Sequence, residues 1–473
     1  MNTTQQQAIT LWQHQREAVE FAKERRSTLW HMGMGTGKSA CAITLAKETD
    51  ARQVIILCPL SVCEAWLDQF EKFGPEYQVA MLNKGSVKAK MKKAATLASK
   101  AAAAHQPFAV IVNYESARNE PFSGWAFGIE WDLLVMDESH RIKSPTGKTS
   151  KWVRRLATAK RGLRQARRPK RRVALTGTVM PHSPLDVWAQ FMALEPSLFG
   201  YSYVLFRKQH AVMGGWQGKE VKGFQKIGLL RSLMSRITYQ CDRSVIELKG
   251  STHQKRIVDL SAKAKKIYDS LETDFCAMVK EGEISAANAL VKLLRLSQTT
   301  SGRVTVEQDD QMTMVKVDDS KEKGLVDLLT DVDPEEPVVV FGRFRSDLDT
   351  VHAAAEKLGR KSLELSGSRR ELKEWQQGDA PILAVQIQSG GTGIDLTRTA
   401  IVCYLSTGYS LGDYEQSLCR ADRPGQERHV AFYHFIARDT VDERIFDALE
   451  NRKQVVESVL DGIHRDAEQR RAR

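Results

Sequence analysis

Eight short apolar runs, rich in β-branched residues, recur along this chain, and longer stretches with helical character separate them. Strands that are apolar along almost their whole length are typical of parallel sheets, because the crossover between two parallel strands places helices on the faces of the sheet. The pattern therefore predicts an α/β fold. The predicted strands lie at 54–60, 108–114, 131–138, 173–178, 338–344, 382–388, 400–406 and 430–437.

The apolar runs form two groups of four, which predicts two tandem α/β lobes with parallel sheets. A chain of 473 residues has room for two or three domains. We expect an N-terminal lobe at 1–245 with a helical insertion at about 183–245, and a C-terminal lobe at 246–473 with a helical insertion at about 261–300. Three shorter segments are interpreted as a helix, a loop, and a polar hairpin or loop, at 94–104, 214–223 and 306–320 respectively.

Charge and cysteine usage narrow the class of protein. The formal net charge is +12, which indicates a polyanionic partner. From Lys151 to Arg172, 11 of 22 residues are Lys or Arg and none is acidic, although such a run is often only a solvated surface.

The apolar runs of the chain are too short for a membrane span of about 20 residues. The seven cysteines have no CxxC spacing, so we expect reduced, mostly buried thiols inside a cell, with no zinc site.

The segment 27–40, STLWHMGMGTGKSA, has the composition of a phosphate-binding loop. Its glycines allow successive N–H groups to face an anion, and a helix that starts at Lys38 adds its positive end. We expect Gly35, Thr36, Gly37, Lys38 and Ser39 to bind nucleotide, with Lys38 on the β- and γ-phosphates and the Ser39 hydroxyl on Mg²⁺. Met32 stands where the usual pattern has its first glycine, so a glycine-rich turn is the alternative.

The predicted strand at 131–138 ends in two carboxylates. Ligands bind at the carboxyl edge of parallel sheets, so this pair is well placed for chemistry on a phosphate. We expect Asp137 to hold Mg²⁺ and Glu138 to orient and deprotonate the attacking water. An acidic pair after a strand can also cap a helix, but together with the phosphate loop it predicts ATP hydrolysis.

Ten segments, in order, resemble the motifs of superfamily-two helicases, and among these the Swi/Snf-type helicase-like ATPases. The resemblance extends from about Leu11 to Ile445. The segments are LWQHQREAVEF (11–21), ILCPLSVCEAWLDQF (56–70), VNYES (112–116), DESHRIKSPTGKTSK (137–151), ALTGT (174–178), VVVFGRFRSDLD (338–349), LSGS (365–368), SGGTGIDLT (389–397), YEQSLCRADRPGQERHV (414–430) and TVDERI (440–445).

The resemblance implies two RecA-like lobes that use ATP and Mg²⁺. In the family, arginines of the second lobe complete the ATP site, and here Arg420 and Arg423 match them, three residues apart in what resembles a helix start. Gln15 matches the adenine-side position. Gln416 and Asp395 match positions that face the cleft between the lobes. Closure around ATP then moves two nucleic-acid contacts relative to each other, which converts hydrolysis into steps.

The resemblance also implies a DNA track that is contacted mainly at the backbone, with duplex DNA as the expected substrate. The matching positions are Pro59, Ser61, Trp66, Thr178, Gly367, Ser368, Gly391 and Thr392. The basic excess at 161–172, with Arg167 and Arg168, is expected to add a further phosphate contact. The implied partners are DNA and proteins bound to it; a monomer in the bacterial or phage-infected cytoplasm, or in a nucleus, is expected.

Two other functions stay open on sequence alone. A strand-separating DNA or RNA helicase needs a wedge, such as a hairpin with an aromatic tip, and 201–224 is where one could lie. An ATP-gated nucleic-acid clamp with little turnover is the third interpretation. The presence of all the charged residues expected for hydrolysis disfavours it: Lys38, Asp137, Glu138, Arg420 and Arg423.

Overall fold

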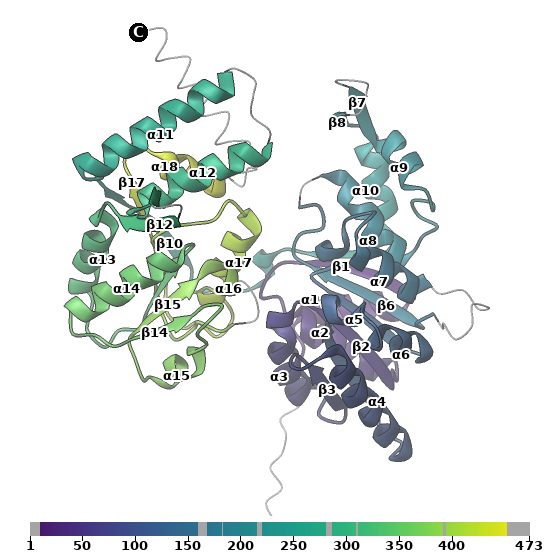
Figure 1. Cartoon of the computed structure of the whole chain (residues 1–473). Helices are drawn as coiled ribbons and strands as arrows, with labels where there is room; N and C mark the ends of the chain where they lie inside the picture. The colour runs from purple at the N-terminus through teal and green to yellow at the C-terminus, as the bar shows by residue number, and fades with distance from the viewer. Residues whose placement is uncertain are drawn as a thin grey trace, which may run out of the picture. The chain divides into compact units, whose positions relative to one another are not determined.

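The computed structural model describes residues 10–158, 168–181, 183–214, 220–280, 286–308, 311–390 and 394–451. The chain divides into two compact units, Met1–Glu247 and Leu248–Arg473. Both units contain a parallel sheet with helices on it, so the predicted α/β fold of two RecA-like lobes is confirmed (Figure 1). No helix within the described residues is long and apolar enough to cross a membrane.

Unit 1 is built on a seven-stranded sheet in the order β3–β4–β2–β5–β6–β1–β9, and every pair in it is parallel. Sequence neighbours are often not sheet neighbours, because helical crossovers carry the chain to the next strand. The strands are β1 (Ser27–Met32), β2 (Gln53–Cys58), β3 (Gln78–Leu82), β4 (Phe108–Asn113), β5 (Leu133–Asp137), β6 (Arg171–Thr176) and β9 (Thr238–Cys241).

Two hydrophobic cores lie on the two faces of this sheet, which explains the near-continuous apolar strands. In β2, Ile55 and Leu57 belong to one core, whereas Val54 and Ile56 belong to the other. Successive side chains of a strand alternate between faces, so a strand covered on both faces needs apolar residues throughout. One core includes residues of α1 (Gln13–Lys23), α2 (Lys38–Glu48) and α3 (Cys63–Phe73); the other includes residues of α4 (Val87–Ala103), α6 (Phe122–Gly128), α7 (Lys148–Thr158) and α8 (Val187–Leu194).

The insertion predicted at about 183–245 is not purely helical. After α8 come α9 (Tyr203–His210), the antiparallel pair β7 (Ala211–Gly214) and β8 (Glu220–Phe224), and α10 (Ile227–Ser235). The loop predicted at 214–223 is therefore wrong in part, because 220–223 belong to β8. The loop reading relied on glycines, which a short hairpin also uses.

Unit 2 contains a six-stranded sheet in the order β10–β17–β16–β13–β15–β14, again parallel throughout. Its strands are β10 (Ser251–Val258), β13 (Val338–Gly342), β14 (Ser362–Leu365), β15 (Ile382–Gln386), β16 (Ile401–Tyr404) and β17 (Val430–Ala437). The helices are α11 (Ala262–Lys280), α12 (Ala286–Thr300), α13 (Ser320–Thr330), α14 (Arg345–Lys357), α15 (Leu372–Gln377), α16 (Ile387–Gly390), α17 (Leu411–Ala421) and α18 (Val441–Glu450).

All eight predicted strands are present, at nearly the predicted bounds. The helices expected within 261–296 are α11 and α12, and the alanine-rich segment lies in α4. The polar segment after α12 is a hairpin of β11 (Arg303–Gln308) and β12 (Gln311–Lys316). Of the six cysteines with described side chains, five are buried and none is in a disulfide, in agreement with the prediction of reduced thiols.

Candidate nucleotide site and nucleic-acid contacts

Four neighbouring strands of unit 1 end at the same edge of the sheet, and each is followed by one of the predicted motifs. In the order β2–β5–β6–β1, the following segments begin at Pro59, Glu138, Gly177 and Gly33. Since parallel strands end on the same side, motifs separated by more than 140 residues are brought to one edge. Most of the candidate nucleotide site therefore lies within a single unit.

The phosphate loop connects β1 to α2, and α2 begins at Lys38. Gly35 and Gly37 have φ angles of 81° and 84°, which favour glycine because a side chain is rarely tolerated there. At Gly37 the space is also closed, since a Cβ atom would lie 2.2 Å from Nε2 of Gln15. The loop thus presents its backbone directly to the N-terminal end of α2, the arrangement expected of an anion-binding loop.

Lys38 and Thr36 are held by carbonyls of the same loop. Nζ of Lys38 donates to the carbonyl oxygens of Met32 and Gly33, each at 3.0 Å. The Thr36 hydroxyl donates to the Gly33 carbonyl at 2.7 Å, and Ser39 lies half-buried in the first turn of α2. The lysine ammonium is thereby positioned over the loop, where its charge adds to the positive end of the helix.

Gln15 supports the loop from α1. Its Nε2 donates to the Thr36 carbonyl at 3.0 Å, and its Oε1 accepts from the backbone N–H of Trp12 at 3.0 Å. His14, a residue that motif matching did not single out, places Nε2 3.0 Å from the same carbonyl. Gln15, the predicted adenine-side residue, therefore connects α1 to the phosphate loop by a hydrogen bond.

Asp137 ends β5 in a buried environment. Burial raises the pKa of this carboxyl group to about 6, and the neighbouring Glu138 carboxylate raises it in the same direction. Hydrogen bonds oppose this shift: the indole Nε1 of Trp66 donates to Oδ2 at 2.8 Å, and the backbone N–H of Glu138 donates to Oδ1 at 2.9 Å. Tyr114 donates its hydroxyl to the Asp137 carbonyl at 2.7 Å. The carboxylate is thus fixed in direction.

Trp66 lies elsewhere than the resemblance implied. It is buried, with 1% of its surface exposed, on the inner face of α3. An indole with this burial and this hydrogen bond orients the Asp137 carboxylate and is not a DNA-contacting side chain. The motif match identified the residue but not its direction, because the direction depends on how α3 packs onto the sheet.

Glu138 has a left-handed backbone, with φ 49° and ψ 54°. This conformation is uncommon for a residue with a side chain and is frequent at functional sites. Oε2 of Glu138 lies 3.3 Å from Nδ1 of His140, and the same ring nitrogen lies 3.2 Å from Oγ1 of Thr176. Oγ1 of Thr176 donates to the Thr178 carbonyl and accepts from the Thr178 N–H, at 2.9 and 3.0 Å.

A polar chain thus runs from Glu138 through His140 and Thr176 to Thr178. It joins the segments that follow β5 and β6. The first segment begins at Glu138, the second member of the predicted carboxylate pair, and the second contains the end of the ALTGT motif at 174–178. His140 was not among the predicted site residues. The only sequence signal for it was its place two residues after the carboxylate pair.

In unit 2, Arg420 lies in the last turn of α17, and Arg423 lies beyond its end. The predicted helix start at these arginines is wrong: α17 begins at Leu411, where the Ser410 hydroxyl caps the Asp413 N–H. The helix ends before Pro424 and Gly425, as expected for residues that disfavour helix. The two arginines are therefore presented from a helix carboxyl end and the turn after it.

Arg423 and Asp395 lie together. Nη1 of Arg423 is 3.7 Å from Oδ2 of Asp395 and donates to the Ile394 carbonyl at 3.3 Å. Their side chains are 31% and 50% exposed. Gln416 is buried in α17. Gln426 was not singled out from the sequence. Its amide Nε2 donates to the Thr399 carbonyl at 2.7 Å, and this bond connects the motif at 414–430 to the residues that follow the motif at 389–397.

The predicted DNA contacts in unit 1 have different exposures. Pro59 is buried at the end of β2, Ser61 is exposed in the following short helix at Leu60–Val62, and Thr178 is half-buried. Arg168 is exposed, whereas Arg167 lies outside the described residues. Ser61 and Arg168 are therefore the exposed members of this set among the described residues.

The end of the basic segment is structural, which limits the predicted phosphate contact. Arg172 is 1% exposed in β6 and donates to the Ser27 hydroxyl at 2.6 Å and the Ala157 carbonyl at 3.1 Å. Burial lowers the pKa of this guanidinium to about 9. Arg171 donates to the Arg25 carbonyl at 2.7 Å. Both guanidinium groups thus donate hydrogen bonds within the fold, in a strand that begins two residues earlier than predicted.

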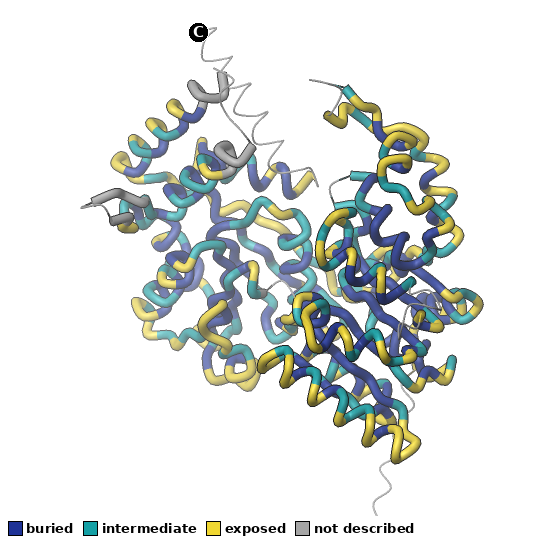
Figure 2. Tube along the Cα trace, turned by 45° about the vertical axis from the view of Figure 1, so that its right-hand side comes forward, coloured by how far each residue is buried: buried dark blue, intermediate teal, exposed yellow. Residues whose placement is uncertain are grey.

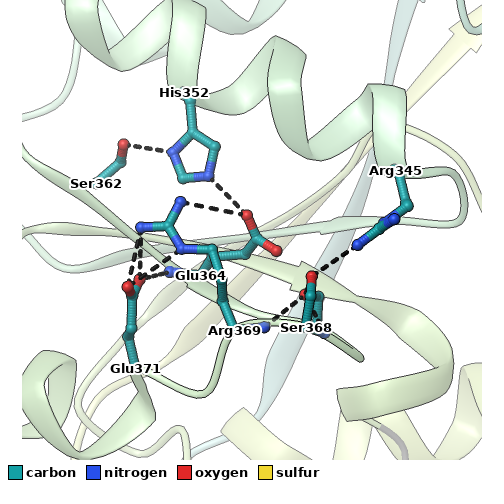
Figure 3. A network of polar contacts seen from close by, with 8 residues as sticks. Arg345, His352, Ser362, Glu364, Ser368, Arg369 and Glu371 are labelled. Carbon is teal, nitrogen blue, oxygen red and sulfur yellow. Dashed lines mark hydrogen bonds and ion pairs between the residues drawn. The ribbon is translucent and has the colours of Figure 1, made fainter.

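In unit 2, Gly367 and Ser368 are exposed in the turn after β14. Arg345, in the first turn of α14, donates to the Ser368 hydroxyl at 2.8 Å (Figure 3). Behind the turn, Arg369 pairs with Glu371 at 2.9 Å and lies 3.5 Å from Glu364. The remaining predicted contacts, Gly391 and Thr392, lie outside the described residues.

Figure 3 shows how His352 completes this network: its ring lies between the Ser362 hydroxyl at 2.7 Å and Oε2 of Glu364 at 3.1 Å. Glu364 is the buried member of this network, and a buried carboxylate requires partners such as these. The turn that carries Ser368 is thus supported on one side by a paired set of side chains and exposed on the other.

Comparisons with known proteins agree with these motifs. The family model of the SNF2-related domain matches residues 14–304. Protein p41 of Acyrthosiphon pisum secondary endosymbiont phage 1 is 25% identical over 466 residues, covering 93% of this chain and 95% of that protein. The mouse chromodomain-helicase-DNA-binding protein 1-like is 23% identical over 451 residues, covering 91% of this chain and 47% of that protein.

Among solved structures, the Sulfolobus solfataricus SWI2/SNF2 ATPase core in complex with double-stranded DNA aligns with a TM-score of 0.43 and 19% identity, covering 97% of this chain and 95% of that one. The chain spans almost all of the phage relative and about half the length of the mouse relative. On the match of the family model to more than half of its residues, the chain belongs to the SNF2-related family, the Swi/Snf-type helicase-like ATPases of helicase superfamily two.

Proposed function

We propose that this protein is an ATP-driven motor that moves along duplex DNA and displaces or remodels proteins bound to it. The observation that carries the proposal is the set of polar groups at one sheet edge of unit 1: the Lys38 loop, the Asp137–Glu138 pair and the chain from Glu138 to Thr178. A hydrolysis site linked by hydrogen bonds to a segment matched to the DNA track is what a motor needs. DNA as the partner also agrees with the name of the mouse relative, a chromodomain-helicase-DNA-binding protein 1-like.

The residues fit Mg²⁺·ATP. Mg²⁺ prefers oxygen ligands, and the Ser39 hydroxyl and the Asp137 carboxylate supply them. Burial makes an ionised Asp137 unfavourable without a nearby cation, and a divalent ion supplies that charge. When bound, the ion neutralises charge on the β- and γ-phosphates. Lys38 and the N–H groups around Gly35 and Gly37 bind those phosphates.

Glu138 has the position of the residue that orients the attacking water. It follows the buried Asp137 directly, and its carboxylate is held next to His140, 3.3 Å away. We infer that Glu138 accepts a proton from water as the γ-phosphoryl group is transferred. The hydrogen-bonded chain from Glu138 to Thr178 then transmits the protonation of this carboxylate to the segment after β6.

Arg420 and Arg423 of unit 2 are proposed to stabilise the charge that develops on the γ-phosphoryl oxygens. Positioned cations of this kind contribute about 10³ to 10⁵ in rate. Asp395, 3.7 Å from Arg423, orients that guanidinium. Hydrolysis that requires residues of both units favours one relative placement of the units before the reaction and another after it, which is the basis of a step.

Backbone-directed contacts suit a motor that must cross any sequence. Ser61 in unit 1 and Ser368 with Arg345 in unit 2 are exposed polar side chains that fit phosphate oxygens. One set of contacts on each unit lets DNA be passed between them. The protein is proposed to work as a monomer, since one chain carries both sets.

The test compares ATP turnover with duplex DNA, single-stranded DNA, RNA and no nucleic acid, together with displacement of a triplex-forming strand. The proposal predicts the largest stimulation by duplex DNA, and ATP-dependent triplex displacement without separation of the duplex. Lys38→Ala abolishes both activities, whereas Lys47→Ala, at the other end of α2, leaves them unchanged. A protein that binds DNA in response to ATP but turns over negligibly is a clamp, and this result rejects the motor.

Strand separation is the second candidate, and the β7–β8 hairpin is the observation that favours it. A hairpin that projects from a motor unit is one form of wedge. Unwinding of a forked duplex that is lost when Val212 and Val221 are replaced by Ser, while triplex displacement is retained, selects this candidate.

A further inference from the structure

Exposed large apolar side chains are concentrated in one short part of unit 1. Fifteen such residues occur in the part of the chain that the structure describes, and eight of them lie between residues 201 and 229. Scattered exposed apolar residues are normal, but a local concentration marks an interaction surface. These eight residues define the α9–hairpin surface: Tyr201, Val204, Leu205, Val212, Met213, Val221, Phe224 and Leu229.

Helix α9 is fixed in its rotation, so its exposed apolar face is a property of the fold. Phe206 and His210 are buried, with their ring centroids 4.8 Å apart, and Phe206 also contacts Phe199 at 5.2 Å. With these residues held inside, Val204 and Leu205 point outward and are 74% and 67% exposed. Solvent-facing positions of a helix are normally polar.

The hairpin continues this surface. Met213 pairs with Val221 across the two strands, and both are exposed. An isolated two-stranded hairpin is marginally stable in water, and exposed apolar pairs need a further layer to cover them. The backbone N–H of Gln225 donates to the His210 carbonyl at 2.9 Å and ties the end of β8 to α9. Figure 1 shows the β7–β8 hairpin, α9 and α10 at one end of unit 1.

The charge of the same segment is strongly one-sided. Residues 201–236 contain seven Lys and Arg residues and a single acidic residue, Glu220. That carboxylate already pairs with Lys222 at 2.6 Å. Lys208, Lys226 and Arg231 are exposed beside the apolar residues. The surface is thus apolar with a cationic surround, which is complementary to an apolar group with an anionic surround.

We propose that the α9–hairpin surface docks an acidic amphipathic segment of a partner protein, with apolar anchors on Val204, Leu205 and Met213 and carboxylates on the surrounding lysines and arginines. Six of the eight apolar residues are aliphatic. Aliphatic side chains pack against other aliphatic groups, whereas bound single strands stack their bases mainly on aromatic rings. The composition therefore favours a protein over a nucleic acid.

The test uses the full chain and three fluorescein-labelled designed peptides. The first is a helical peptide with leucine at i, i+3, i+4 and i+7 and glutamate elsewhere. The second keeps the leucines and replaces glutamate by lysine; the third keeps glutamate and replaces leucine by serine. Fluorescence anisotropy is measured against wild type, the double variant Val204→Ser/Leu205→Ser, and Lys226→Glu/Arg231→Glu. The control variant is Met314→Ser/Val315→Ser, an exposed apolar pair of unit 2.

The proposal predicts that the acidic amphipathic peptide binds tightest, and that both α9–hairpin variants weaken it about tenfold, as expected when an interface anchor is lost. The control variant binds like wild type, and all variants keep their melting temperature and basal ATPase activity because the changed side chains are exposed. Equal binding of the acidic peptide to wild type and the apolar variant overturns the proposal, as does no binding at all.

Two other outcomes identify a different occupant and also overturn it. Loss of binding to single-stranded DNA in the apolar variant, with peptide binding unchanged, assigns the surface to nucleic acid. A wild-type dimer that becomes a monomer in the apolar variant, measured by sedimentation, assigns the surface to a second copy of this chain.

Discussion

The two candidate halves of the ATP site differ in how tightly their residues are held. In unit 1, Gln15 and Asp137 are each 7% exposed and fixed by hydrogen bonds to neighbouring segments. In unit 2, Arg423 and Asp395 are 31% and 50% exposed and pair loosely at 3.7 Å. We therefore propose that the first half is already arranged to bind nucleotide, and that the exposed charge of the second half acts on a ligand held by the first.

The largest effect expected from this comparison concerns Arg423. Arg423→Ala is predicted to slow ATP hydrolysis by about 10³ while ATP affinity changes little, because the finger acts on the transition state. Single-turnover kinetics and nucleotide binding measured separately check this. Arg428→Ala, an arginine of the same loop that pairs with Glu336 at 2.8 Å, is the matched control. Equal loss of affinity and turnover would place Arg423 in ground-state binding instead.

Glu138 is the corresponding residue in the tightly held half. Glu138→Gln keeps the shape of the side chain but removes the proton acceptor, so turnover is predicted to fall by about 10² or more with ATP binding retained. The measurement is a bound-nucleotide assay beside steady-state turnover. His140→Ala tests the adjoining chain: it is expected to reduce DNA stimulation more than basal turnover. Loss of ATP binding in Glu138→Gln contradicts the water-orienting role.

The difference between buried and exposed segments also explains which parts of the fold could be predicted from the sequence. Strands such as β2 and β13 were predicted because both faces are covered and almost every position is apolar. By contrast, β10 was missed because most of its residues are exposed, which removes the apolar signal. Motif matching located Trp66 and Arg423, but the burial of Trp66 depends on how α3 packs, and the end of α17 depends on Pro424 and Gly425. Residue identity was predictable where a motif was matched; side-chain direction was not.

Trp66 gives a smaller and more specific test. A hydrogen bond to an ionised group contributes about 1.5 kcal/mol or more, so Trp66→Phe is predicted to weaken Mg²⁺ binding by at least about tenfold. Manganese binding followed by electron paramagnetic resonance, with ADP present, measures this without turnover. The matched control is Trp131→Phe, which removes an indole hydrogen bond to the Ala126 backbone carbonyl at 2.9 Å instead of one to a carboxylate. An unchanged metal affinity in Trp66→Phe removes the positioning role.

The smallest expected effect concerns the basic segment. Replacing Arg164, Arg167 and Arg168 by Gln is predicted to lower the salt dependence of DNA binding, since each lost phosphate contact reduces the slope by about 0.9. Arg172 is left in place because its replacement disturbs the fold. Binding constants measured at several salt concentrations provide the slope of log binding constant against log salt concentration. An unchanged slope shows that this segment makes no phosphate contact.

The central claim is that arginines of unit 2 act on ATP bound by unit 1. An experimental structure of the protein with duplex DNA, Mg²⁺ and ADP–beryllium fluoride tests it most directly. The account predicts the guanidinium of Arg423 or Arg420 within about 3 Å of the fluoride that replaces a γ-phosphoryl oxygen, with Lys38 on the opposite side. Nucleotide bound at the Lys38 loop with both arginines far from the fluoride contradicts the account.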